Sequence, residues 1–184
     1  MDIDEYYNAS YEVRDNFLSE VDFAKLEKAI MGPDFNWNYS YNVSVDSDSE
    51  NDIYFIHLFY MGMVKEAKYD LEGKPIPPEK SPFYKFIEPL LEKLPDFQTL
   101  IRAKANLYVA RDKLIHHKDH VDTKFSHKGA ILYMNDNDGF TVLEDGTEIE
   151  SKTNRLLLFD PSKPHHSTSC TKDKRRVNIN INYL

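Results

Sequence analysis

A strict alternation of polar and apolar residues near the end of the chain constrains the fold more than any other feature. From Arg176 to Tyr183 every second residue is Val, Ile or Tyr, and the residues between them are Arg or Asn. Because successive side chains of a β-strand point to opposite faces, this segment predicts a strand with one apolar and one polar face. If the apolar row packs beneath helices, Arg176 points into a barrel, whereas Arg175 shares the phase of the outward row.

The segment 100–109 shows the same division between two faces. Its apolar side chains occupy every second position from Ile101 to Val109, and between them stand the long polar side chains of Arg102, Lys104, Asn106 and Tyr108. The apolar face suits packing beneath helices, and the polar face suits the lining of a cavity. We therefore expect a sheet with helices outside and a polar pocket inside.

Two helices are predicted to cover the apolar faces. The first has Ser19 as its N-cap and Gly32-Pro33 as its stop. The second runs from Ser81 to Leu94, with Pro82 at its first helical position. The apolar residues of the first helix near helical spacing are Val21, Phe23, Leu26 and Ile30.

The remaining segments predict strands and loops. Strands are expected at 37–44, 53–60, 129–135 and 154–159, and a hairpin at 140–151. In that hairpin the pair Asp145-Gly146 favours a tight primed turn. The segment 62–80 contains three prolines and predicts a long loop, which is a candidate substrate lid. The expected class is mainly β with flanking helices (α+β), the N-terminal helices packing on the outside of the major sheet.

Length and composition limit the class of protein further. A chain of 184 residues fits one domain, 1–184, which can bury a core without disulfides. The net charge of −8 argues against nucleic acid as a partner. The single Cys170 and the absence of a secretion signal predict a reducing compartment, the cytoplasm. No apolar stretch approaches the ~20 residues of a membrane helix, so we expect a soluble protein without a membrane partner.

The histidines cluster, because six of the seven lie between His116 and His166. In a strand, His120 and Asp122 would offer a nitrogen and a carboxylate oxygen to one point in space. A second histidine from a neighbouring strand would complete a set of two imidazoles and one carboxylate, which is typical of non-haem Fe(II) oxygenases. The spacing alone leaves a solvated polar turn open, since His117-Lys118-Asp119 forms a second triplet of the same kind.

The segments 55–60 and 105–108 resemble short bacteriophage members of the Fe(II)- and 2-oxoglutarate-dependent dioxygenases of the prolyl 4-hydroxylase-like group, and four motifs in order resemble that group as a whole. These motifs are His120-Val121-Asp122, then 131–135 with 138–141, then 154–159 with Pro164-His165, and finally 176–180. The resemblance implies a double-stranded β-helix core, which is a jelly-roll or cupin-like fold. It also implies the host cytoplasm if a phage encodes the chain.

The resemblance further implies a set of site residues. The metal ligands would be His120, Asp122 and His165, because the distal histidine of the family lies six residues after the strand phenylalanine, here Phe159. Arg176 would bind the far carboxylate of 2-oxoglutarate, with Tyr133 adding a hydrogen bond and Tyr108 approaching from another side. With Fe(II) and O₂, 2-oxoglutarate would be converted to succinate and CO₂ while a small-molecule or peptide substrate is hydroxylated.

Other interpretations remain open at this stage. The barrel could be a cupin-like binding module without catalysis, or a metal-dependent isomerase or hydrolase. The motifs do not identify the substrate, although they favour slightly a peptidyl-proline or other amino-acid side chain, and they do not indicate the oligomeric state. The other histidines and Arg155 are not expected to be ligands. His57 is expected in the core or a pocket wall, and His116 and His117 at the surface or behind the metal ligands. His127 is expected to anchor a loop and Arg155 to be structural, whereas His166 could line the site or face solvent.

Overall fold

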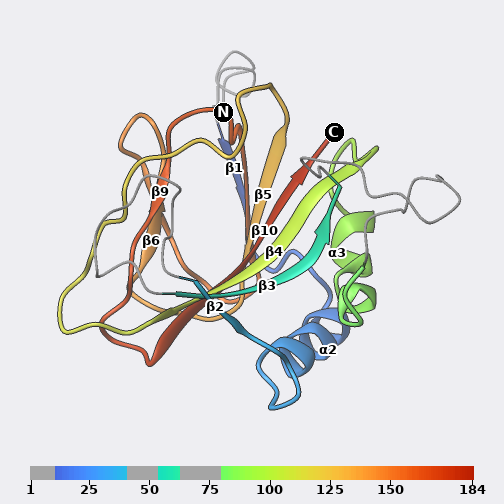
Figure 1. Cartoon of the computed structure of the whole chain (residues 1–184), viewed down its shortest axis with the longest axis horizontal. Helices are drawn as coiled ribbons and strands as arrows, with labels where there is room; N and C mark the ends of the chain where they lie inside the picture. Colours follow the sequence, from blue (N-terminus) through green and yellow to red (C-terminus); the bar gives the residue numbers. More distant parts are fainter. Residues whose placement is uncertain (1–10, 41–53, 63–79) are drawn as a thin grey trace, which may run out of the picture.

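The computed structural model describes residues 11–40, 54–62 and 80–184, which form two antiparallel sheets with helices on one side (Figure 1). The larger sheet has the order β1-β8-β5-β10-β4-β3-β2, and the smaller has the order β7-β6-β9. The strands of the larger sheet are β1 Tyr11–Arg14, β2 Asn38–Ser40, β3 Tyr54–Met61, β4 Leu100–Val109, β5 Lys128–Tyr133, β8 Arg155–Phe159 and β10 Arg175–Tyr183. Those of the smaller sheet are β6 Phe140–Val142, β7 Glu148–Glu150 and β9 His166–Ser167.

The two strands with divided faces lie side by side at the centre of the larger sheet. In the register of β4 and β10, Arg102 pairs with Asn182 and Tyr108 pairs with Arg176. The polar side chains from Arg102 to Tyr108 and from Arg176 to Asn182 therefore stand on one face, as the alternation predicts, and only Arg175 at the start of β10 has the opposite phase. The opposite face carries Val177, Ile179, Ile181 and Tyr183 of β10, which are all buried.

The main hydrophobic core lies between this apolar face and the helices. It joins Leu26 and Ile30 of α2 (Glu20–Ile30) and Leu90 of α3 (Glu88–Glu92) to the apolar row of β10. Figure 1 shows both helices on the side of the large sheet that faces away from β6 and β9. The predicted double-stranded β-helix with outer helices is confirmed.

A smaller apolar cluster occupies part of the space between the two sheets. It contains Ile131 and Tyr133 of β5, Leu157 and Phe159 of β8, and Ile149 of β7. The interior is therefore divided: the half beneath β5 and β8 is mainly apolar, and the half beneath β4 and β10 is polar. This division leaves the polar half to hold a site.

Of the two helices, α2 is predicted correctly and the second is not. Ser19 Oγ accepts a hydrogen bond from the Asp22 amide at 3.2 Å, although Val21 is 63% exposed instead of packing inward. The predicted helix from Ser81 to Leu94 is broken into a 3₁₀ turn, η1 (Tyr84–Phe86), and the short α3. A continuous helix would place Pro89 in its interior, where it lacks an N–H and clashes with the preceding turn. In α3 it occupies the first turn instead.

The hairpin and the edge strands differ from expectation in detail. The hairpin joins β6 to β7, but Gly146 alone in its turn has a positive φ (82°). The Leu143 amide donates to the Thr147 carbonyl, which makes a three-residue loop in place of a two-residue primed turn. The edge strand β1 was not predicted. Residues 41–44 of the first predicted strand, and most of the candidate lid 62–80, lie outside the described residues.

Within the described ranges, neither α2 nor α3 has the length and apolar character that crossing a bilayer requires.

Candidate metal centre

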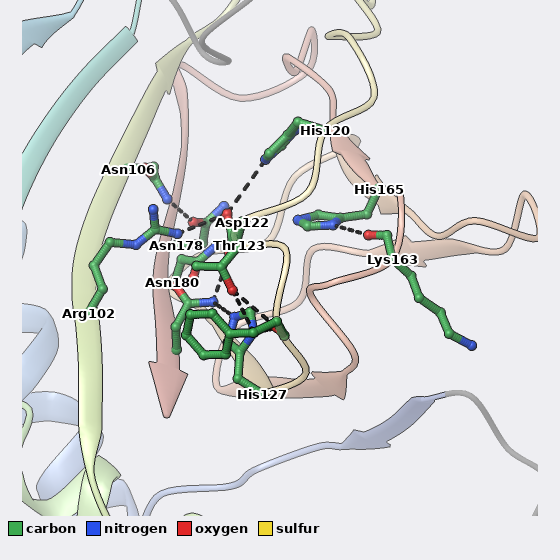
Figure 2. Close-up of polar contacts among 12 residues, drawn as sticks. Arg102, Asn106, His120, Asp122, Thr123, His127, Lys163, His165, Asn178 and Asn180 are labelled. Carbon is green, nitrogen blue, oxygen red and sulfur yellow. Dashed lines mark hydrogen bonds and ion pairs between the residues drawn. The ribbon is translucent and has the colours of Figure 1, made fainter. Parts of the chain in front are cut away.

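His120, Asp122 and His165 converge on one point at the mouth of the polar half of the barrel (Figure 2). One potential ligand atom from each residue lies within 4.8 Å of the others. The two histidines face each other through an antiparallel bridge, in which each amide donates to the other's carbonyl at 3.0 Å. The Asp122 amide donates to the Pro161 carbonyl at 2.9 Å. The expected continuous strand at 120–122 is therefore wrong, and isolated extended pairing produces the convergence instead.

The rings of both histidines are arranged to offer lone pairs. His165 Nδ1 lies 3.0 Å from the Lys163 carbonyl, so this nitrogen carries the proton and Nε2 is an acceptor. His165 Nε2 is buried and has no hydrogen-bond partner in the described part of the chain. Burial, together with the nearby His165, lowers the pKa of His120 to about 4, so His120 is neutral near pH 7. An unpaired buried acceptor costs about 1–3 kcal/mol, which a bound cation would offset.

The Asp122 carboxylate is held from two sides. Arg102 Nη2 lies 2.9 Å from Oδ1, and Asn182 Nδ2 donates to Oδ2 at 2.8 Å. Burial alone would raise the pKa of Asp122, but the charge of Arg102, the neighbouring His165 and the Asn182 hydrogen bond hold this pKa well below its ordinary value. The carboxylate is therefore ionised and oriented toward the two histidines.

Arg176 lies deeper in the same half of the barrel and is fully buried. Its guanidinium donates to Ser151 Oγ at 2.9 Å, to Thr141 Oγ1 at 3.1 Å and to the Thr168 carbonyl at 3.4 Å. Among the described residues no carboxylate pairs with it. A buried guanidinium without a counter-charge is costly, which makes this position suited to an anionic ligand.

Two tyrosines flank this guanidinium, one on each neighbouring strand. The rings of Tyr108 and Tyr133 lie 5.3 and 5.7 Å from the centre of the Arg176 guanidinium. The Tyr133 hydroxyl donates to Thr141 Oγ1 at 2.8 Å, and the Tyr108 hydroxyl accepts from Ser167 Oγ at 3.2 Å. Burial raises the pKa of both phenols, so both remain neutral.

No protein-family model matches the sequence, and neither does any curated protein. An oxidoreductase of the 2OG-Fe(II) oxygenase family from Burkholderia pseudomallei has a similar structure, with a TM-score of 0.71 at 8% identity over 98% of this chain and 87% of its own. The chain has the fold of the 2-oxoglutarate- and Fe(II)-dependent oxygenases. The predicted family resemblance is confirmed at this level.

Two further solved structures share this oxygenase fold. A prolyl hydroxylase from Trichoplax adhaerens, in complex with an oxygen degradation domain peptide of hypoxia inducible factor, has a TM-score of 0.58 at 14% identity, covering 98% of this chain and 86% of its own. A non-haem α-ketoglutarate-dependent epimerase from nogalamycin biosynthesis has a TM-score of 0.62 at 12% identity, covering 98% and 80%. The fold therefore carries more than one reaction.

In this oxygenase fold the donor set of the candidate centre fits iron. Two imidazoles and one carboxylate on one side of a point form the facial arrangement typical of non-haem Fe(II). The buried, partnerless Nε2 of His165 supports a cation at this point.

The other histidines make hydrogen bonds away from this centre. His166 Nδ1 lies 2.6 Å from Asp119 Oδ1, although its side chain lines the cleft beside His165. His116 is exposed and contacts His166, whereas His117 is buried and stacks on Tyr108 with ring centroids 5.2 Å apart. Two more histidines anchor loops: His57 bonds to Asn36 and Ser81, and His127 bonds to Phe125 and Asn182. Arg155 is paired with Asp15.

Sequence patterns placed several further residues on the polar face without indicating their roles. Arg102 braces the Asp122 carboxylate, and Thr141 connects Tyr133 to Arg176. Lys104 and Asn106 line the cleft from β4. The long polar side chains at alternate positions of 100–109 were the only signal for three of these four, and Thr141 was indicated only as part of the 138–141 motif of the family resemblance.

Proposed function

We propose that this protein is an Fe(II)- and 2-oxoglutarate-dependent oxygenase with iron at His120, Asp122 and His165. The observation that carries the proposal is Arg176, a fully buried guanidinium without a carboxylate partner in the described part of the chain. It shares the polar half of the barrel with the three convergent ligands. A dicarboxylate such as 2-oxoglutarate could meet the metal with one end and Arg176 with the other.

The metal site depends on side chains that hold their ligands in place. Arg102 and Asn182 keep the Asp122 carboxylate ionised and oriented, and the Lys163 carbonyl fixes the His165 ring so that Nε2 faces the centre. With iron bound, the centre would support oxidative decarboxylation of 2-oxoglutarate to succinate and CO₂, coupled to oxidation of a substrate.

Hydrogen-bond donors remain at the end of the cleft that is proposed to bind 2-oxoglutarate. Three of the five N–H groups of Arg176 donate to Ser151, Thr141 and Thr168, and the guanidinium also contacts the Tyr108 hydroxyl, so an N–H group is left for a carboxylate. Thr141 Oγ1 already accepts from Tyr133 and Arg176, so its own hydrogen is available to donate into the cleft. We therefore propose that Arg176 and Thr141 bind the far carboxylate directly, with Tyr133 supporting it through Thr141 and Tyr108 packing beside it.

The oxidised substrate belongs to the proposal as well. One protein of the same fold is bound to a peptide in its structure, and another is described as an epimerase. We favour hydroxylation of an amino-acid or peptide side chain, which includes prolyl hydroxylation.

The proposal is tested by anaerobic titration with Fe(II) and 2-oxoglutarate, following the metal-to-ligand charge-transfer band, and then by succinate release in air. The Asp122→Ala variant should give neither signal while keeping its fold. A wild-type protein that neither binds 2-oxoglutarate nor releases succinate would support the non-catalytic binding module instead.

A further inference from the structure

Lys104 stands in the cleft beside the metal ligands without an assigned partner. It lies on the polar face of β4 between Arg102 and Asn106, opposite Asn180 of β10, and its side chain is half-buried. The ion pairs formed within 11–40, 54–62 and 80–184 do not include it, and its ammonium lies 5.5 Å from the centre of the Tyr54 ring. Burial, with the charge of Arg102, lowers the pKa of Lys104 to about 8, which still leaves it mainly cationic at pH 7.

Among the cations of the cleft, Lys104 is the one to which no anion is assigned. Arg102 is paired with Asp122, and Arg176 is assigned to 2-oxoglutarate in the proposed function. The 2-oxoglutarate dianion carries two negative charges against the three positive charges of Fe(II) and Arg176, so it leaves none for Lys104. Lys104 therefore remains uncompensated, in a chain whose overall charge is −8.

A second unsatisfied group lies next to Lys104 on the same strand face. Asn106 donates through Nδ2 to Asn178 Oδ1 at 2.8 Å, but its own Oδ1 is buried and accepts no hydrogen bond from the residues that the structure describes. Because 2-oxoglutarate carries only acceptors, it cannot satisfy this oxygen. The cleft thus contains a cation to which no anion is assigned, Lys104, and an acceptor to which no donor is assigned, Asn106 Oδ1, two residues apart on β4.

The neighbourhood of Lys104 is also open to a molecule that arrives from solvent. On the adjacent strand β3, its register partner Leu58 is 41% exposed, whereas Arg176 and Tyr133 at the other end are fully buried. The cosubstrate end is closed and the Lys104 side is accessible. A ligand at Lys104 would therefore be the oxidised substrate.

From these observations we infer that the substrate is a free α-amino acid, whose carboxylate pairs with Lys104 and whose ammonium group donates to Asn106 Oδ1. The inference rests on the proposed function for its reaction and on Lys104 and Asn106 for its specificity. The Lys104 ammonium matches a carboxylate and Asn106 Oδ1 matches an N–H donor, whereas a phosphate dianion carries only acceptors and would leave Asn106 Oδ1 unsatisfied.

The test measures binding, so it does not require turnover. Mn(II)-loaded protein saturated with 2-oxoglutarate is titrated anaerobically with each proteinogenic L-amino acid. The fully esterified form and the N-acetyl form of each amino acid are titrated in the same way. Glycerol 3-phosphate serves as the phosphate probe. At least one free amino acid should bind, and the ester and the N-acetyl form should each bind about 10- to 100-fold more weakly, as expected for loss of a charge-assisted hydrogen bond.

Variants assign the effect to its residues. Lys104→Met should lose about 10- to 100-fold of amino-acid affinity and its preference for the acid over the ester, and Lys104→Arg should restore part of both. Lys25→Met, an exposed lysine on α2, is the matched control and should bind like the wild type. Thermal unfolding of each variant checks that it is folded, and Lys104→Gln replaces Lys104→Met if the latter is not.

Four results would overturn the inference: no free amino acid binds, the ester binds as well as the acid, glycerol 3-phosphate binds in preference to both, or Lys104→Met weakens 2-oxoglutarate in place of the amino acid. Failure of the proposed function is a separate observation, because it removes the Fe(II)–2-oxoglutarate charge-transfer band of the wild type and leaves the amino-acid titration interpretable.

Discussion

Arg102 Nη2 lies 2.9 Å from Asp122 Oδ1, and this same oxygen lies 3.8 Å from His120 Nε2. One carboxylate oxygen thus faces both a fixed cation and the proposed metal position. The guanidinium stands on a central strand of the larger sheet, so its position is set by the fold. Arg102 is in effect a permanent counter-charge that keeps the proposed ligand anionic before any metal arrives.

Replacing Arg102 with Leu should therefore weaken metal binding. Burial raises the pKa of Asp122, and Arg102 counteracts this effect. Without Arg102, the pKa of Asp122 therefore moves upward from its depressed value. Protons then compete with the metal at a higher pH than in the wild type. We expect about 10- to 100-fold lower Mn(II) affinity at pH 6, measured calorimetrically, with a smaller difference at pH 8. Arg175→Leu is the control, and equal affinity in all three proteins would contradict this role.

Acid should destabilise the metal-free protein in a defined window because of His120. Burial and the neighbouring His165 lower the pKa of His120 from its ordinary 6.5 to about 4. Between these values the unfolded chain binds a proton that the folded chain does not. The free energy of unfolding should therefore fall as the pH drops from 6.5 to 4, by on the order of 3 kcal/mol at most. Urea unfolding at several pH values measures this slope, and His120→Gln should show a shallower one.

Arg176 and Arg175 should differ sharply in their effect on cosubstrate binding. Arg176 is fully buried beside Tyr108 and Tyr133, whereas Arg175 is exposed. Loss of a buried partner of a carboxylate costs about 3–5 kcal/mol, so Arg176→Ala should weaken 2-oxoglutarate by roughly two orders of magnitude or more. Arg175→Ala should change it little. Anaerobic titration of the charge-transfer band tests both, and the reverse ranking would refute the assignment.

Metal affinity should depend on His165 and not on His166. His165 belongs to the converging group, whereas His166 Nδ1 is hydrogen-bonded to Asp119 and its Nε2 lies 3.2 Å from His116 Nδ1. His165→Gln should lose about 100-fold or more of Mn(II) affinity, and His166→Gln should keep it within a few-fold. Equilibrium dialysis compares the two, and strong loss in His166→Gln alone would mean that the ligand is misassigned.

Gly139 should be needed for the position of Arg176. A Cβ at residue 139 would lie 2.7 Å from Arg176 Cδ and would also overlap the Ser169 carbonyl. Gly139→Ala should therefore displace the guanidinium, weaken 2-oxoglutarate binding and cost about 1–3 kcal/mol of stability. Gly146→Ala tests a glycine with open space around it, where only the positive φ is strained. Unchanged 2-oxoglutarate affinity in Gly139→Ala would show that Arg176 tolerates the shift.

The sequence predicts most of the sheet because β4 and β10 alternate without interruption, and alternation maps directly onto the two faces of a strand. The broken second helix was missed because apolar spacing outweighed Pro89, whose ring excludes it from a helix interior. The edge strand β1 was missed because it is short and largely exposed.

For the candidate site, motif spacing indicated His120, Asp122 and His165 as the ligands. It could not show which of the polar residues on the sheet contact them. The Arg102–Asp122 ion pair joins residues on different elements. Such a contact depends on how the loop carrying Asp122 folds back over β4, and local patterns do not contain that information.

The apolar row and the polar row of β10 together limit which sequence changes this protein can accept. One set of backbone hydrogen bonds, from the nine residues of β10 to β4 and β5, sets both the apolar row and the polar row. Inserting a single residue in this strand would turn Val177 and Ile179 into the cleft and Arg176 out of it at the same moment. Point substitutions can alter either row separately, but changes in the length of β10 act on the core and the cleft together. Evolution can therefore change this site only through substitutions that preserve the register of the strand.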